Sequence, residues 1–375
     1  MTRLENKFKD AFVAGFGSGG YCLPFAKGRV ALYAGLKALD LPPGSSIILP
    51  AYTCVVVASA IQFAGFKPLY VDIDPATYNI NPRNLPPAAA IIAQHSYGIP
   101  ADMDALLEYD VPLIEDCCHV FASTYKGQKC GTFGRFSFFS GQWNKFFSSG
   151  LGGFFYTQDS QLAQKTAPIF EDATIPGTVD ALRYALQIMA HELLVTPTTE
   201  AFITRLYRHL TRAGIAAGSS TPAELQGREP ANYFTRMTAP QLYKGIFELS
   251  RIEKNIAHRR KIGTFYHDRL KDIGFSPVTL PSDTDTVFLR YPVLIANKTA
   301  LLEKAARAGI EIGSWFETPL HGNHVPLEVF GYRPGSCPIA EKTAHEVINL
   351  PTHQGVSEAY AEKALKFLKL HGRGD

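Results

Sequence analysis

Cysteine is scarce in this sequence, with six among 375 residues, too few for the disulfide framework of a small secreted domain. No CxxC pair occurs and no histidine–cysteine cluster has the spacing of a zinc site, so we expect no metal. An excess of charge is also lacking. The 37 Lys and Arg against 34 Asp and Glu leave a formal net charge of +3, which argues against nucleic acid as a partner.

Long hydrophobic runs are missing too. No stretch reaches the roughly 18 apolar residues of a membrane span, and the charged first ten residues lack the apolar core of a signal peptide. We therefore expect a cytoplasmic protein without a membrane span. No GxGxxG motif follows a predicted strand and no phosphate-loop lysine occurs, which argues against a nicotinamide-dependent dehydrogenase.

Short apolar runs bounded by Gly, Pro or Asp alternate with helix-length segments between residues 28 and 159. Buried strands that alternate with helices are typical of a mostly parallel sheet covered on both faces. The sequence therefore predicts an α/β fold. The expected strands are 46–49, 68–71, 88–93, 111–114, 135–139 and 153–156, with helices such as 54–63 and 101–108 between them.

The alternation stops at residue 160. Two amphipathic helices are expected at 182–194 and 201–210, followed by a polar loop at 216–232. A capping box at Thr238 then starts a long helix, in which the basic run 258–261 is expected to face solvent. We predict a large domain over residues 1–250, with 160–232 as an atypical inserted helical segment, and a smaller C-terminal α+β domain over 251–375.

One lysine stands out in an aromatic, glycine-rich segment. Lys145 lies among five rings, and burial beside them would lower its pKa and leave a neutral amine that can form a Schiff base. Asp116 ends a predicted strand, where parallel sheets bind ligands. From residue types alone, a lysine that extends from an aromatic core, with Asp116 as a structural acid, remains an alternative. The rings are Phe138, Phe139, Trp143, Phe146 and Phe147.

An ordered set of blocks along the chain resembles the DegT/StrS-type aminotransferases, which have the aspartate aminotransferase fold (fold type I). The resemblance implies a large pyridoxal-phosphate (PLP) transferase domain with a mostly parallel sheet and a smaller C-terminal α+β domain. It leaves out residues 160–232. The blocks are 27–39, 43–53, 65–74, 95–104, 114–116, 125–134, 136–145 and 236–241, with a weaker one at 350–353.

The resemblance also implies roles for individual residues. Lys145 would be the catalytic Schiff-base lysine for pyridoxal 5'-phosphate, and Asp116 would pair with the pyridinium nitrogen of this cofactor. His119 would pack beside the cofactor ring, and Cys54 stands where the family often has an aromatic ring. Arg236 would reach the cofactor phosphate of a neighbouring subunit. The phosphate of the chain's own cofactor would be bound by Ser137 and by the helix start at Gly28, Arg29 and Val30.

The implied function is transfer of an amino group, with L-glutamate as donor, to a nucleotide-linked keto-sugar. The mechanism would be ping-pong, with pyridoxamine phosphate as the intermediate form of the cofactor, in a homodimer with a shared active site. Two alternatives stay open: a non-catalytic or regulatory protein with this fold, and a cofactor-dependent sugar-modifying enzyme with another acceptor. Residues 160–232 are expected to form a lid, a dimer contact or an acceptor pocket.

Overall fold

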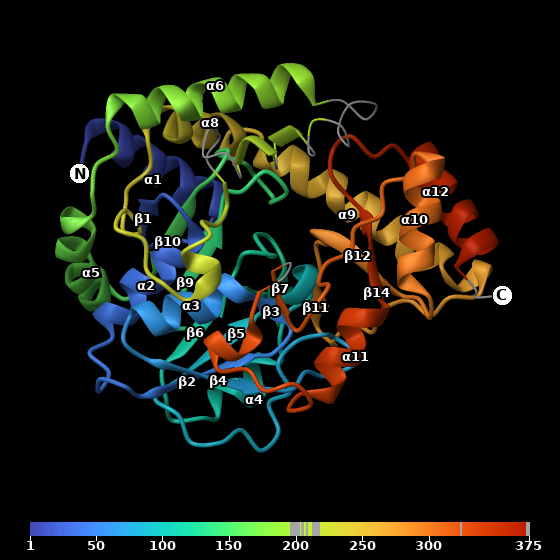
Figure 1. Cartoon of the computed structure of the whole chain (residues 1–375), viewed down its shortest axis with the longest axis horizontal. Coiled ribbons are helices and arrows are strands. Elements are labelled where there is room, and N and C mark those ends of the chain that lie inside the picture. The colour runs from blue at the N-terminus through green and yellow to red at the C-terminus, as the bar shows by residue number, and fades with distance from the viewer. Residues whose placement is uncertain (196–202, 204–205, 208, 212–217, 323–324, 373–375) are drawn as a thin grey trace.

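The computed structural model describes residues 1–195, 203, 206–207, 209–211, 218–322 and 325–372. Its centre is a seven-stranded sheet with the order β1-β10-β9-β6-β5-β2-β4 (Figure 1). The strands from β4 to β9 are parallel to one another, and β10 and β1 add antiparallel pairs at one edge. The strands are β1 (Tyr21–Phe25), β2 (Ser46–Pro50), β4 (Lys67–Val71), β5 (Ala90–Gln94), β6 (Leu113–Asp116), β9 (Phe136–Ser140) and β10 (Gly153–Thr157).

Each of the six predicted strands is present, within about two residues of its expected bounds, and the mostly parallel α/β sheet is confirmed. Alternate side chains of each strand enter different cores. Ala90 and Ile92 of β5 pack in one core with the helices α2 and α3, whereas Ile91 and Ala93 pack in another with α4. Helices therefore cover both faces. Their bounds are α2 (Gly28–Ala38), α3 (Val55–Phe63) and α4 (Met103–Leu107).

The N-terminal helix α1 (Arg3–Phe16) was not predicted from the charged start of the chain. A capping box between Thr2 and Glu5 fixes its first turn, and its buried face is made of phenylalanines. Phe8, Phe12 and Phe16 pack against rings from β9 and β10. This helix therefore closes one face of the sheet edge.

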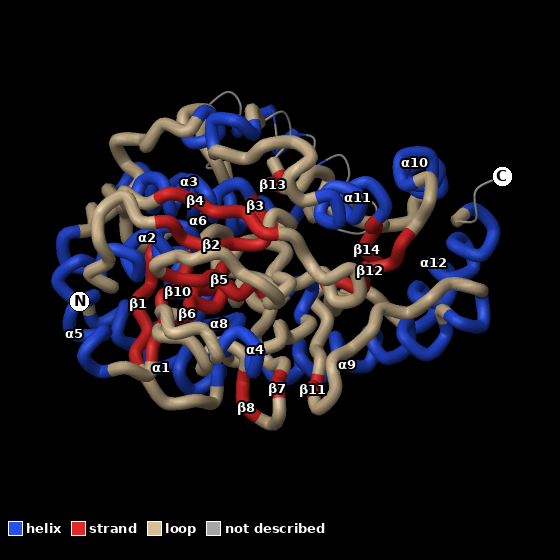
Figure 2. The backbone as a smooth tube through the Cα atoms, turned by 90° about the horizontal axis from the view of Figure 1, so that it is seen from below, coloured by secondary structure: helices blue, strands red, loops and turns tan. Residues whose placement is uncertain are grey.

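The long helix expected after Thr238 is divided in two. α8 (Ala239–Leu249) and α9 (Ile252–Arg269) are separated at Ser250 and Arg251. Most of the C-terminal elements beyond α9 gather at one end of the molecule (Figure 2). They include the antiparallel pair of β12 (Arg290–Leu294) and β14 (Val347–Pro351), with the helices α10 (Lys298–Ala308), α11 (Pro338–Glu346) and α12 (Glu358–His371).

The C-terminal part also returns to the large domain through two short strand pairs. β13 (Leu320–His321) pairs with β3 (Thr53–Cys54), and β11 (Thr284–Asp285) pairs with β7 (Thr124–Tyr125), which itself forms a hairpin with β8 (Gln128–Lys129). The β13 pair brings the chain around Trp315 and Phe316 to the region where the parallel strands end.

The segment at 160–232 contains α5 (Ser160–Asp172), α6 (Thr178–Leu194) and a short 3₁₀ turn η2 (Glu224–Gln226). The predicted helix at 201–210 falls largely outside the described residues. α6 lies across α8 on the outside of the molecule (Figure 1). Ile188 is its one buried residue, and six large apolar side chains along it are exposed. These are Val179, Leu182, Leu186, Met189, Leu193 and Leu194.

Among the described residues, no helix combines the length and the apolar character that crossing a membrane requires.

Candidate active site

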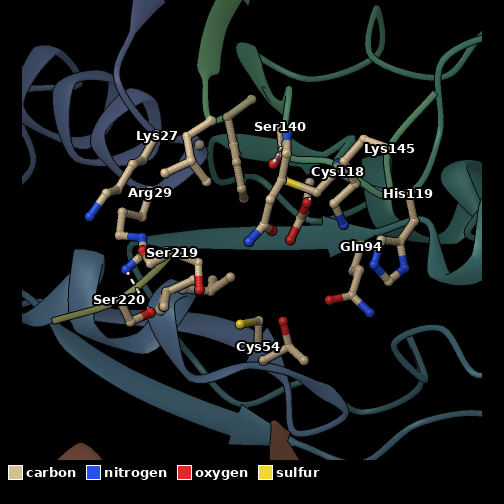
Figure 3. A pocket seen from close by; sticks show the side chains of 18 of the residues that line it. Lys27, Arg29, Cys54, Gln94, Cys118, His119, Ser140, Lys145, Ser219 and Ser220 are labelled. Atoms are coloured by element: carbon tan, nitrogen blue, oxygen red, sulfur yellow. Dashed lines mark hydrogen bonds between the residues drawn. The ribbon is translucent and has the colours of Figure 1, made fainter. Parts of the chain in front are cut away.

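A cavity opens where three neighbouring parallel strands end. Gln94, Asp116 and Ser140 are the last residues of β5, β6 and β9, and all three line it. Ligands in parallel α/β sheets bind at this edge. The free volume, counted with the solvent at the mouth, is about 770 Å³. Figure 3 shows Lys145, His119 and Gln94 at one end of the cavity, and Lys27, Arg29, Ser219 and Ser220 at the other.

Lys145 has the environment expected of a nucleophilic amine. Burial lowers its pKa, and the nearby Arg290 guanidinium acts in the same direction, whereas the Asp116 carboxylate opposes the shift. Its Nζ lies 5.0 Å from the centroid of the Trp315 ring. The predicted direction of the pKa shift is therefore confirmed, and a larger share of neutral amine follows.

Most of the rings that are near Lys145 in sequence do not line the cavity that holds it. Of the five rings near Lys145 in sequence, Phe138 lines the cavity, but Phe139, Phe146 and Phe147 belong to the core beneath α1. Strand alternation explains part of this, because Phe138 and Phe139 leave β9 on opposite faces. Trp143 instead stacks on His191 of α6, with ring centroids 4.0 Å apart. The prediction of a pocket walled by all five rings was wrong.

Asp116 and His119 both line the cavity beside Lys145. Burial raises the pKa of Asp116, while the Cys118 backbone amide, which donates to it at 2.9 Å, lowers that pKa. Burial also holds the pKa of His119 well below its usual value, with Lys145 and Arg290 acting in the same direction. The neutral ring of His119 stacks on Trp315 at an interplanar angle of 5°. His119 thus presents a flat, uncharged ring at the Lys145 end of the cavity.

Cys54 also lines the cavity, at the start of α3. Burial raises the pKa of its thiol, so the group is protonated and weakly nucleophilic. Its Sγ lies 3.6 Å from the carbonyl oxygen of His321. Cys54 therefore acts as a small packing group in this wall of the cavity.

The start of α2 forms the far end of the cavity. A Cβ on Gly153 would lie 2.0 Å from the Lys27 carbonyl carbon, so only glycine lets β10 approach this helix start. Gly28 and Arg29 line the cavity. Val30 does not, and its amide already donates to the carbonyl oxygen of Lys27 at 3.0 Å.

Ser137, expected at the phosphate, is fully buried on the opposite face of β9 from the cavity. Its hydroxyl donates to the carbonyl oxygen of Gly131 at 2.9 Å. Side chains alternate along a strand, so the serine three positions later, Ser140, takes the place toward the cavity. Assignment of each residue to a face of the strand indicates that Ser140, and not Ser137, faces the cavity.

Arg236 lies away from the cavity and is bound within its own chain. Its Nη2 donates to Glu171 at 2.7 Å, its Nη1 lies 3.7 Å from Glu5, and its guanidinium covers the ring of Phe170. The side chain is 5% exposed. The structure thus gives Arg236 a contact between α1 and α5, and a role at a neighbouring subunit stays a prediction.

The basic run at 258–261 is only half solvated. Arg260 and Lys261 form exposed ion pairs, but Arg259 is buried. Arg259 donates to the carbonyl oxygens of Leu289, at 2.7 Å, and Lys145, at 3.3 Å. The expectation of a solvated face was wrong for this residue, which instead supports the backbone of the lysine segment.

Three side chains of metal-ligand type lie close together near the ends of β5 and β6. Suitable atoms of His95, Glu115 and Cys117 all lie within 4.8 Å of one another. However, the Glu115 carboxylate already accepts hydrogen bonds from His95 and from three backbone amides, of Gly131, Phe133 and Gly134. Its acceptor positions are taken, so this cluster is a buried hydrogen-bond network that fixes the loop after β8.

The structure brings together Lys145, Asp116, His119, Cys54, Gly28 and Arg29 around one cavity, and places Ser137, Val30 and Arg236 elsewhere. Sequence reasoning missed several polar wall residues. Two of them come from the segment at 160–232, which no strand pattern connects to the sheet. The missed residues are Lys27, Gln94, Ser219 and Ser220.

The chain is similar to known proteins over almost its whole length. The model of the DegT/DnrJ/EryC1/StrS aminotransferase family matches residues 2–369. UDP-2-acetamido-2-deoxy-3-oxo-D-glucuronate aminotransferase of Pseudomonas aeruginosa is 28% identical over 94% of this chain and 85% of its own length. L-glutamine:2-deoxy-scyllo-inosose aminotransferase of Micromonospora echinospora is 35% identical, over 45% of this chain and 42% of its own.

A solved structure has the same fold. The crystal structure of DesV from S. venezuelae, in complex with a ketimine intermediate, superposes with a TM-score of 0.74 at 21% identity. The match covers all of this chain and 91% of that one. The fold-type expectation is therefore confirmed over the full length.

Proposed function

Because the chain belongs to the DegT/DnrJ/EryC1/StrS aminotransferase family, we propose that it transfers an amino group to the keto group of a nucleotide-linked sugar, with Lys145 as the catalytic residue. The observation that carries the proposal is the buried amine of Lys145, which shares one cavity with Asp116 and the neutral His119. L-Glutamate is the proposed donor. Donor and acceptor would react in turn in the same cavity.

The residues of the cavity fit pyridoxal phosphate by their chemistry. The set contains an amine of lowered pKa, a buried carboxylate, a flat uncharged ring and, at the far end, two cationic side chains. When bound, this cofactor supplies an aldehyde carbon that an amine can attack and a conjugated ring that accepts electrons. Lys145 would hold it through Nζ, Asp116 would face the ring nitrogen, and His119 would pack on the ring.

The chain's own groups account for the remaining requirements of the reaction. The neutral Nζ of Lys145 is a nucleophile and can afterwards accept a proton and deliver it within the same cavity. The Asp116 carboxylate favours a protonated nitrogen next to it, which is how an acid at a strand end strengthens an electron sink. The stacked rings of His119 and Trp315 cover this end and help to exclude water.

Reduction with borohydride tests the assignment of Lys145. The purified protein is mixed with pyridoxal phosphate, reduced, digested and analysed by peptide mass. We expect irreversible attachment at Lys145, none in Lys145→Ala, and normal attachment in Lys261→Ala, which removes an exposed lysine. Absence of attachment at Lys145 in the wild type would contradict the proposal and favour a non-catalytic protein.

The donor and the acceptor are tested separately. In the absence of acceptor, L-glutamate should release one equivalent of 2-oxoglutarate per loaded site, and L-glutamine should not react. Nucleotide-linked keto-sugars are then compared with keto-cyclitols, because a relative with partial coverage bears a name that specifies L-glutamine and an inosose. Turnover with the cyclitols alone would refute the proposed acceptor class.

We also propose a homodimer. The supporting observation is the exposed apolar face of α6 together with Tyr243 and Phe247 of α8, which are 65% and 50% exposed. Lys244 joins the two helices through Glu192, so the side chains lie on adjacent elements. Patches of this kind mark interaction sites on proteins. Sedimentation of the wild type and of Leu186→Glu tests it: dimers should give way to monomers in the variant.

A further inference from the structure

The end of the cavity opposite Lys145 holds an unbalanced group of charges. Lys27 and Arg29 flank the start of α2, and Glu224 of η2 is the one carboxylate paired with them in the described part of the chain. Two cations and one anion leave an excess of one positive charge. The carboxylate is 1% exposed, and the Lys27 and Arg29 side chains are 21% and 7% exposed. An excess charge held away from bulk water favours the binding of an anion.

Hydrogen-bond donors of Arg29 are used in contacts with the inserted segment. Its Nη1 donates to the Glu224 carboxylate at 2.6 Å and to the Ser220 hydroxyl at 3.1 Å, and its Nη2 donates to the Ser219 carbonyl oxygen at 2.6 Å. The second carboxylate oxygen of Glu224 accepts from the Thr221 amide at 2.7 Å. Arg29 therefore fastens residues 219–224 as a wall of the cavity.

Lys27 has only a long contact with Glu224, the carboxylate that pairs with it among the described residues. Its Nζ lies 3.6 Å from Glu224 Oε2, and the nearer partners of that carboxylate are Arg29 and Thr221. Burial and the neighbouring Arg29 lower the pKa of Lys27 to about 8, and Glu224 acts against this shift. A bound anion would satisfy the ammonium and restore its preference for the charged form.

We propose that the Lys27 ammonium binds the phosphate group of the cofactor directly, while Arg29 holds the inserted segment around it. The proposal rests on the proposed function, because it takes the anion to be the phosphate of pyridoxal phosphate. The position fits, since Lys27 lines the cavity at the end away from Lys145 (Figure 3). The cofactor site of this chain is thus completed by residues 219–224, and Lys27 supplies the cationic contact that Arg29 does not.

Binding of two related aldehydes isolates the phosphate contact. Protein freed of cofactor is titrated with pyridoxal phosphate and with pyridoxal, which has the same ring and aldehyde but no phosphate, and both are followed by absorbance. In Lys27→Gln we expect the Kd for pyridoxal phosphate to rise at least about tenfold, as for a lost charged hydrogen bond, with that for pyridoxal unchanged. Lys27→Arg should recover most of the affinity, and Lys37→Gln, at the other end of α2, should match the wild type.

Inorganic phosphate provides a second measurement that does not need Lys145. It should raise the thermal midpoint of the wild type and of Lys37→Gln but not that of Lys27→Gln. Equal weakening of both aldehydes in Lys27→Gln, or unchanged binding of pyridoxal phosphate, would overturn the proposal. So would a loss of UDP binding to the cofactor-loaded variant with cofactor affinity intact, because the phosphate would then belong to the acceptor. Failure of borohydride attachment at Lys145 would refute the proposed function and leave the phosphate measurement valid.

Discussion

Removing the Arg29 guanidinium should detach the inserted segment from the large domain. In Arg29→Met, the Glu224 carboxylate, which is 1% exposed, loses its 2.6 Å partner. Breaking a buried ion pair by deleting one partner costs about 3–5 kcal/mol. Lys27 remains 3.6 Å from the carboxylate and compensates in part, so we expect the low end, about 3 kcal/mol.

Hydrogen exchange of residues 219–227 measures this cost locally. The amides of Thr221, Leu225, Gln226 and Gly227 are all hydrogen-bonded in this segment. A loss of about 3 kcal/mol corresponds to a fall in their protection of roughly 100-fold. Removal of the unpaired anion should reverse part of the effect, so Arg29→Met combined with Glu224→Gln should regain at least about 1 kcal/mol over the single variant.

The loss of stability in Arg29→Met, here called the deficit, should also depend on pH. Burial raises the pKa of Glu224, but Arg29 and Lys27 outweigh it and hold the pKa below the ordinary value of 4.5. In the wild type the stabilisation is therefore complete above that value and is lost as pH falls through the lower, folded-state pKa. In Arg29→Met the carboxylate protonates more readily, so the deficit should be smaller at pH 5 than at pH 8. A deficit that does not change with pH, or protection equal to that of the wild type, would refute the argument.

Three further predictions follow from the geometry. Gly153→Ala places a Cβ 2.0 Å from the Lys27 backbone, so it should lower the thermal midpoint and abolish cofactor binding, whereas Gly177→Ala, which meets nothing within 4 Å, should change neither. Phe12→Ala should destabilise the protein by about 3–5 kcal/mol in urea unfolding because it opens the phenylalanine core, while leaving the pyridoxal Kd of the folded protein unchanged; a changed Kd would place that core at the site. The Glu115 carboxylate accepts four hydrogen bonds, and the amide of Glu115→Gln must lose at least one of them. The substitution should therefore lower the free energy of unfolding by about 2 kcal/mol or more. It should leave the metal content, measured by mass spectrometry, unchanged.

Most of the fold could be predicted from the sequence, because apolar runs and turn residues are local signals for strands and helices. Strands and helices of the parallel sheet were found within a few residues, and Asp116 was placed at a strand end for a physical reason. The helix α1 was missed because its phenylalanines are spaced among many charges. The break at Ser250 was missed because the apolar stripe continues across it.

Residues of the site were predictable where one strand or helix start determines them. Ser137 and Ser140 lie on opposite faces of β9, so proximity in sequence does not tell which of them lines the cavity, and the same alternation separates Phe138 from Phe139 near Lys145. Ser219 and Ser220 could not be foreseen, because the contact between Arg29 and Glu224 that holds their segment at the cavity joins positions 195 residues apart. Such a contact leaves no pattern in a single sequence.

The contact that Arg29 makes between the start of α2 and residues 219–224 determines how chimeras of this enzyme with its relatives have to be built. A chimera that replaces residues 160–232 as one cassette would remove Glu224 and leave Arg29 buried opposite a foreign loop. The graft would then fail because of this unpaired arginine, whatever the sequence of the new segment. Exchange of the segment therefore requires positions 27 and 29 to be transferred with it. The start of α2 and residues 160–232 thus have to be exchanged together, although they are far apart in the sequence.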